Sequence, residues 1–161
     1  MWRSIAIFLI GGVLGTAFGV AVGFFAFPYV FSPPEAMEKL MPAERSARVA
    51  QGTFIHANPS DPIHHGKGKV TVYERIVHLG KDFEVGPGPA FHVYLVPKAN
   101  IRQSSDVKET MFIDLGRLRA FKGSQKYQIP TGVKLKDYAS VVIWCAHFGV
   151  LISPADLLFE N

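Results

Sequence analysis

The chain has 161 residues, of which 48% are hydrophobic and 19% charged, and its formal net charge is +4. This length allows about one globular domain. The charges are interspersed and form no basic run, which excludes the electrostatic footprint of a nucleic-acid-binding protein. The single cysteine, Cys145, cannot form an intramolecular disulfide, so the chain is not a disulfide-stabilised scaffold.

The N-terminal segment from Ser4 to Phe27 carries no charged residue and reads SIAIFLIGGVLGTAFGVAVGFFAF. As a helix it would be roughly 36 Å long, enough to cross a hydrocarbon core of about 30 Å. A cleaved signal peptide is the alternative, because Ala21-Val22-Gly23 places small residues at a possible cleavage site. Apolar regions of signal peptides are usually about 7–15 residues long, however. We therefore expect an uncleaved, single-pass anchor over residues 4–27 in the inner or plasma membrane.

The flanking charges predict the orientation of this anchor. Arg3 and the α-amino group precede the segment, whereas the first cation after it is Lys39. Because Lys and Arg near a span favour the cytoplasmic side, the N-terminus is predicted to be cytoplasmic. Arg45 and Arg48 weaken this asymmetry. The rest of the chain is then expected to be extracytoplasmic, for example in a periplasm.

Glycines recur at every fourth position within the anchor, at Gly11, Gly15, Gly19 and Gly23. This spacing places them on one helix face, where small residues allow a second helix to approach closely. Besides the lipid bilayer, the expected partners are therefore helices of other membrane proteins or a second copy of the chain. The alternative is that glycine is simply frequent in membrane helices.

Residues 28–51 are predicted to be a linker with short helices. The segments EAMEKL and AERSARVA have amphipathic patterns, and Pro42 between them suits a first helical position. We therefore expect residues from Ala36 to Ala50 to be helical and to lie outside the following domain.

From residue 52 to residue 159 the hydrophobic pattern changes to alternation. About seven runs rich in β-branched and aromatic residues are bounded by Gly, Pro, Asn and Asp, and no long helical segment separates them. This pattern predicts an all-β domain, an antiparallel β-sandwich or barrel. The expected core includes Val72, Phe91, Tyr94, Val142, Ile143, Trp144 and Phe148.

The run from Ser140 to Ser153 reads SVVIWCAHFGVLIS and contains the only cysteine. As one strand, it would direct Cys145 and His147 to the same face, roughly 7 Å apart. That separation is too long for a direct thiol–imidazole hydrogen bond, but both side chains would line one pocket. The alternative is that Cys145 is a small hydrophobic core residue, because free cysteines are often buried.

A histidine pair, His64 and His65, precedes the predicted strand that begins near Gly68. Imidazoles bind several transition metals, so the pair is a candidate for metal binding; the alternative is a polar start to a hairpin. No haem-attachment, paired-cysteine zinc, HExxH or phosphate-loop motif is present. The sequence also lacks a hydrolase or transferase constellation, so no catalytic residue is assigned and the cofactor is unknown.

Several segments, taken in order, resemble the DM-thirteen domain, also called the electron-transfer DM-thirteen domain. They are QGTF, HHGKGKVTVY, KDFEVGPGPAFHVYL, IDLGRLRAFKGSQKYQIP and YASVVIWCAHFGVLISPADL, and together they cover about residues 52–157. The family's histidine followed by a small-residue turn corresponds to His65 through Gly68. Its glycine-proline before a VYL-like strand corresponds to Gly88-Pro89, and its cysteine near the end corresponds to Cys145.

The resemblance implies an all-β domain with a redox role, in which Cys145 acts as a free thiol or as the ligand of a prosthetic group such as haem. The family often accompanies DOMON-type domains, which bind haem or sugars. His147 lies outside the family pattern, so His65 is the better second candidate, and His64 and His147 are weaker ones.

Two functions of different classes follow from these features. In the first, the chain is a membrane-anchored redox or ligand-binding module that uses Cys145 with His65 beside it. In the second, it is a non-catalytic accessory subunit that docks to a membrane complex through the glycine face of its anchor and the surface of its β domain.

The anchor is predicted to survive maturation. Mass spectrometry of the mature chain should therefore find an N-terminus upstream of the apolar segment. An N-terminus near Phe24 would instead identify that segment as a signal peptide, because a peptidase would have cut after the small residues Ala21 to Gly23.

Overall fold

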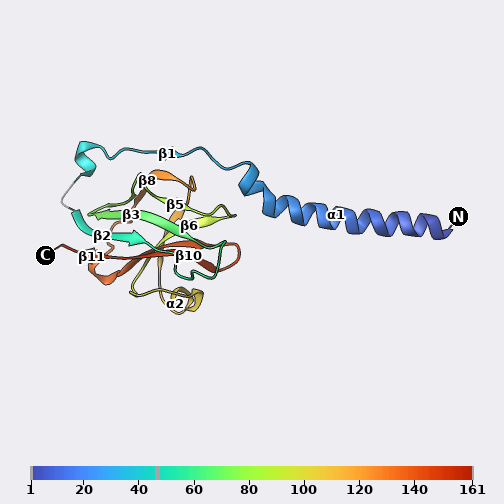
Figure 1. Cartoon of the computed structure of the whole chain (residues 1–161). Coiled ribbons are helices and arrows are strands. Elements are labelled where there is room, and N and C mark those ends of the chain that lie inside the picture. The colour runs from blue at the N-terminus through green and yellow to red at the C-terminus, as the bar shows by residue number, and fades with distance from the viewer. Residues whose placement is uncertain (1, 46–47, 161) are drawn as a thin grey trace. The chain divides into compact units, whose positions relative to one another are not determined.

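The computed structural model describes residues 2–45 and 48–160. It contains two compact units, one extending to Ser32 and the other beginning at Pro33. The first unit is a helix and the second is built mainly of strands (Figure 1).

The first unit is the helix α1, Trp2–Val30. It is the one helix in the described part of the chain that is long and apolar enough to cross a membrane, and a signal sequence would share both properties. Apart from the adjacent residues and the backbone of the helix itself, Cβ atoms built on Gly11, Gly15, Gly19 and Gly23 would meet no atom within 4 Å among the described residues. The glycine face predicted from the sequence is therefore open on this helix.

The second unit contains two sheets. The larger sheet has seven strands in the order β1-β8-β4-β3-β2-β11, with β5 paired to β3. Its strands are β1 Ala36–Met37, β2 Arg48–Phe54, β3 Gly66–Tyr73, β4 Ile76–Leu79, β5 Glu84–Val85, β8 Gly123–Gln128 and β11 Leu158–Phe159. All of these pairings are antiparallel except that of β1 with β8, which is parallel.

The smaller sheet has four strands in the order β10-β9-β6-β7, all antiparallel. They are β6 Phe91–Val96, β7 Ile113–Arg117, β9 Ser140–Cys145 and β10 Val150–Asp156. One short helix, α2 Ser104–Lys108, and two 3₁₀ turns, η1 Pro42–Glu44 and η2 Leu135–Asp137, complete the unit. The fold is thus mostly β and sandwich-like, and the sheets do not close into a barrel.

Side chains of both sheets meet in the main core. Val70 and Val77 from the larger sheet pack in one cluster with Val93 and Ile143 from the smaller sheet. A second cluster covers the other face of the smaller sheet, where Tyr94, Val142 and Trp144 pack with Val107 of α2. Alternation along β6 and β9 therefore supplies both clusters, as period-two side-chain directions require.

The prediction of linker helices is wrong. Ala36–Met37 forms an edge strand, only Pro42–Glu44 is helical (as a 3₁₀ turn), and Arg48–Ala50 begins β2; residues 46 and 47 lie outside the described ranges. Hydrogen bonds and ion pairs fix the segment to β8 and to Arg119, which precedes that strand. Glu38 bonds Arg119 at 2.8 Å, and Glu44 bonds Lys126 at 2.7 Å. These contacts between residues far apart in sequence outweigh a weak local helical pattern.

The prediction of a single strand from Ser140 to Ser153 is also wrong, because the run is a hairpin. β9 ends at Cys145, a turn follows, and β10 begins at Val150. The Gly149 amide donates to the Cys145 carbonyl at 2.8 Å, and Gly149 has a φ of 63°. Phe148 is therefore in the turn and 47% exposed instead of in the core. The other predicted core residues are buried.

Residues 114–130 belong to the segment IDLGRLRAFKGSQKYQIP and have a structural role. Gln125 is fully buried, and its Oε1 accepts hydrogen bonds from the Arg119 amide at 3.0 Å and the Tyr127 hydroxyl at 2.9 Å. Its Nε2 donates to the Ala120 carbonyl at 2.8 Å. Burial raises the pKa of Tyr127 to about 12, which keeps its hydroxyl protonated as a donor. The motif thus holds the start of β8 in place.

Two glycines allow a test of how β1 is held. Gly123 and Gly132 both have φ near 90°, but only at Gly123 would a Cβ overlap the backbone of Ala36. Gly132→Ala should lower the free energy of unfolding by about 1–2 kcal/mol through backbone conformation alone. Gly123→Ala should cost about 1–3 kcal/mol more because β1 must shift.

The measurement is urea unfolding of the full chain in detergent, with the slope of the transition checked for constancy. Equal losses in the two variants would show that the β1–β8 pairing contributes nothing to stability.

Candidate functional site

The candidate site is centred on Cys145, the last residue of β9. Cys145 pairs with Phe91 of β6 and Val150 of β10, and only 1% of its surface is exposed. Its Sγ donates a hydrogen bond to the Pro89 carbonyl at 3.2 Å. In this bond the thiol is the donor and the carbonyl oxygen the acceptor.

The chain between β5 and β6, residues 86–90, covers this thiol and is called the cover segment below. Ala90 has a φ of 50°, an uncommon conformation for a residue with a side chain, and its carbonyl accepts the Ala146 amide at 3.0 Å. Gly88 packs against the ring of Phe91 so closely that a Cβ would overlap it. The cover segment is therefore a tight, locally constrained connection that contacts the sulfur through the Pro89 carbonyl.

His65 lies at the other end of the cover segment. Its carbonyl accepts the Gly86 amide at 3.2 Å, and a Cβ on Gly86 would lie 3.0 Å from the His65 ring. A side chain at position 86 would therefore crowd the His65 imidazole. Cys145 and His65, the two main residues predicted from the sequence, contact the same segment through Pro89 and Gly86, respectively.

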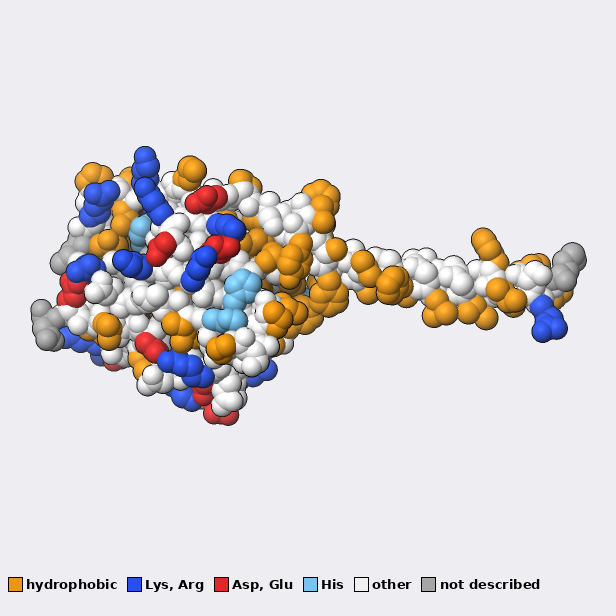
Figure 2. Space-filling view, viewed as in Figure 1, with side chains coloured by type: hydrophobic (Ala, Val, Ile, Leu, Met, Phe, Trp, Pro, Cys, Tyr) orange, Lys and Arg blue, Asp and Glu red, His pale blue; other side chains and the backbone are white. Residues whose placement is uncertain are grey.

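Asp61 organises the remaining histidines of the loop before β3. Its carboxylate accepts hydrogen bonds from Nδ1 of His64 at 2.6 Å and from the amides of Ile63 and His64. Its carbonyl is hydrogen-bonded to Nε2 of His56 at 2.7 Å. The bond from the His64 side chain, followed by the two amides, lowers the pKa of Asp61 to about 2. The His56 ring lies 5.9 Å from that of His65. Figure 2 shows histidine side chains grouped on one face.

The predicted metal and haem sites find limited support in this geometry. Among the described residues, no group of three His, Cys, Asp or Glu side chains is placed to hold a metal ion. A prosthetic group bound to Cys145 would have to displace the Pro89 carbonyl and the core around the sulfur. The arrangement at Cys145 therefore does not fit a bound haem.

The single-strand prediction placed His147 and Cys145 on the same strand face, and this is wrong. It lies in the turn between β9 and β10, and its ring is 4.8 Å from that of Phe148. Sequence reasoning also missed Pro89, Gly86, His56 and Asp61 as neighbours of the candidate residues. Asp61 had a detectable pattern, because NPSDP is typical of a turn in which Asx side chains bind nearby amides.

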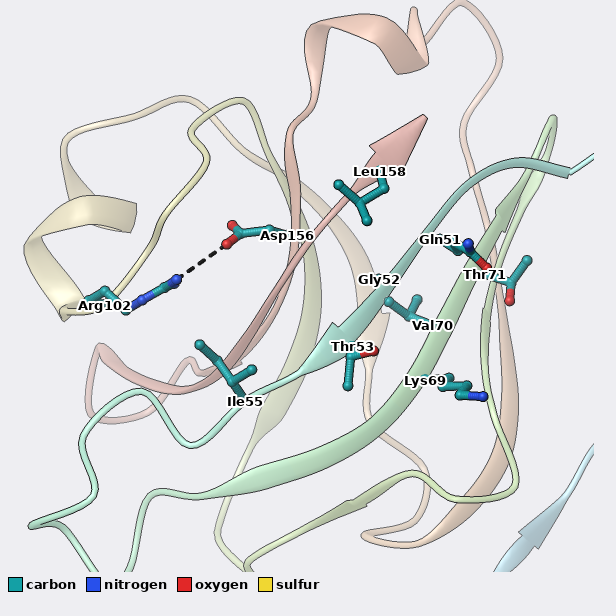
Figure 3. Close-up of a pocket in the computed structure, with 10 residues that line it drawn as sticks. All are labelled: Gln51, Gly52, Thr53, Ile55, Lys69, Val70, Thr71, Arg102, Asp156 and Leu158. Carbon is teal, nitrogen blue, oxygen red and sulfur yellow. Dashed lines mark hydrogen bonds and ion pairs between the residues drawn. The ribbon is translucent and has the colours of Figure 1, made fainter. Parts of the chain in front are cut away.

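A groove of about 490 Å³ lies elsewhere on the second unit (Figure 3). Gln51, Thr53, Lys69 and Thr71 line it along β2 and β3, and opposite them Arg102 is ion-paired with Asp156 at 3.4 Å. Its lining contains neither the cysteine nor a histidine. The groove is therefore separate from the candidate redox residue.

These features define a class of protein: a small two-sheet β domain with one buried thiol under a constrained loop, preceded by an apolar helix. A model of the family described as electron transfer DM13 matches residues 59–157, which is more than half of the chain. The chain belongs to the electron transfer DM13 family. No curated protein and no solved structure matches it. The expected family is thus confirmed, and membership indicates a redox-related role.

The low pKa of Asp61 generates a testable pH dependence. Because its pKa in the folded chain, about 2, lies below the ordinary value of 3.8, its contribution to loop order is full above pH 3.8. That contribution is lost as the pH falls towards about 2. The amide NMR shifts of Ile63 and His64 should follow this transition.

Asp61→Asn should remove the transition, because the amide side chain does not titrate. Asp106, whose pKa is also lowered to about 2 but by Lys98, provides a matched control in Asp106→Asn. A transition at Ile63 and His64 that persists in Asp61→Asn would contradict the assignment.

Proposed function

We propose that this chain is a membrane-anchored redox protein whose working group is the Cys145 thiol. The observation that carries the proposal is the contact between the Cys145 Sγ and the Pro89 carbonyl, in a chain of the electron transfer DM13 family. The thiol lies at the end of β9, where it packs in the main core cluster and also bonds to the 86–90 loop. In the proposal, movement of this loop gives a partner access to the sulfur.

The chemistry proposed is reversible thiol–disulfide exchange. The Cys145 thiol loses its proton and the resulting thiolate attacks one sulfur of a disulfide supplied by a partner. The partner's S–S bond breaks, a mixed disulfide with Cys145 forms, and the leaving thiolate takes up a proton. Cys145 is oxidised and the partner sulfur is reduced, so electrons and protons balance. A second thiol reverses the step.

The cover segment controls this reaction in the proposal. While the Pro89 carbonyl accepts the S–H bond, the sulfur is neutral and shielded, and a thiolate would be repelled by the carbonyl oxygen. Displacement of residues 86–90 removes both obstacles. His65, which contacts Gly86 at the other end, is proposed to position the segment.

The membrane part of the proposal rests on α1. The helix Trp2–Val30 is long and apolar enough to span a bilayer, and we propose that it anchors the domain with the N-terminus in the cytoplasm and the β domain outside it. The open glycine face is proposed to pack against another membrane helix. The redox partner would then be a membrane or extracytoplasmic protein.

The experiment uses oxidised glutathione as the disulfide. The folded full chain in detergent should form a mixed disulfide at Cys145, seen by intact mass, and reduced glutathione should release it. Cys145→Ser is the control, because its hydroxyl can donate to the Pro89 carbonyl and should preserve the fold while forming no adduct.

Cys145→Ala removes the donor to Pro89 and should be no more than about 1–3 kcal/mol less stable, the usual cost of an unsatisfied buried group. A wild-type chain that forms the adduct only after unfolding would contradict the proposal, because Cys145 would then be a core residue.

A further inference from the structure

The second unit receives the chain at the same end that carries the candidate site. The Ala36 amide donates to the Lys122 carbonyl at 3.0 Å, and the Val85 amide donates to the Phe121 carbonyl at 2.9 Å. Val85 in turn pairs with Gly66, the residue after His65. Three strand spacings of about 4.8 Å therefore separate β1 from the start of β3, a distance of roughly 14 Å.

The connection before β1 is short. Only residues 31–35 lie between the last residue of α1, Val30, and the first residue of β1, Ala36. The six steps from Val30 to Ala36 span at most about 22 Å, whatever the direction in which the chain leaves the helix. This limit follows from chain length alone.

The segment after Ala36 adds no unpaired length to this connection. β1 pairs with β8, Ser124 Oγ donates to the Glu38 carbonyl at 2.7 Å, and Glu38 bonds Arg119. The chain is therefore hydrogen-bonded to the β domain from Ala36 onward.

The composition of this end suits a lipid headgroup region. Ile63, beside the histidine pair, is 56% exposed, and Phe148 in the β9–β10 turn is 47% exposed. Lys67 and Lys122 flank Glu84 at 3.1 and 2.8 Å, so two cations surround one carboxylate. Exposed apolar side chains among cations are typical of surfaces that rest on a bilayer.

We propose that this end of the β domain, formed by residues 62–67, 86–90, 121–122 and 146–149, rests on the bilayer surface. The inference depends on the proposed anchoring by α1. The cover segment would then lie at the lipid–water boundary, so the redox partner of Cys145 must present its disulfide at that level. A partner whose reactive group lies far above the membrane could not reach the thiol.

The test measures the depth of labelled positions in a membrane. The full chain carrying Cys145→Ala, so that no native thiol remains, receives Ile63→Cys or, separately, Lys122→Cys, and each is labelled with a fluorophore. Glu74→Cys is the matched control: Glu74 is exposed and lies just beyond Tyr73, at the far end of β3 from His65. The chains are reconstituted in phosphatidylcholine–phosphatidylglycerol vesicles that contain lipids with a quencher at the headgroup.

The inference predicts loss of fluorescence at Ile63 and Lys122 and little loss at Glu74. Equal quenching at all three positions, stronger quenching at Glu74, or none at any would overturn it. Because these variants lack the Cys145 thiol, the result is independent of the glutathione experiment. Failure of the membrane orientation therefore leaves the redox proposal standing, and the converse also holds.

Discussion

The strand β9 has no exposed face, because all six of its residues are buried. One row of its side chains packs in the core between the sheets, and the other, with Trp144, packs beneath α2. A strand buried on both sides needs cover on both sides, which accounts for the two-sheet arrangement and for the short helix over the smaller sheet. At its end Cys145 still packs in the main core, and its thiol bonds to the 86–90 loop. The position of the thiol is thus a consequence of where the most buried strand ends.

Much of this architecture could be predicted from alternation in the sequence. Period-two patterning located the strands and most of the core, because burial on a pleated sheet imposes that period locally. It failed at residues 146–149, where the turn contains Ala, His and Phe and only Gly149 indicates a break. An apolar turn between two apolar strands has the same local pattern as one long strand. The separation of His147 from Cys145 and the exposure of Phe148 both follow from that ambiguity.

The site was harder to predict than the fold because its contacts join distant segments. Cys145 and His65 were recognisable as reactive residue types, but Pro89 contributes a carbonyl and Gly86 an amide, and backbone groups leave no trace in residue identity. The prediction of helices in the linker was wrong for a similar reason. Its amphipathic pattern favours a helix locally, whereas pairing with β8 and the ion pairs of Glu38 and Glu44 are visible only once the domain has folded.

The central claim is that a local movement of residues 86–90, and not global unfolding, exposes the Cys145 thiol. The most direct measurement is the rate at which a small, neutral thiol reagent modifies Cys145 in the folded chain, compared with the rate of global unfolding under the same conditions. Local opening generally needs less free energy than global unfolding. Modification much faster than unfolding is the predicted result. Modification limited to the unfolding rate would contradict the claim and make Cys145 a buried core residue.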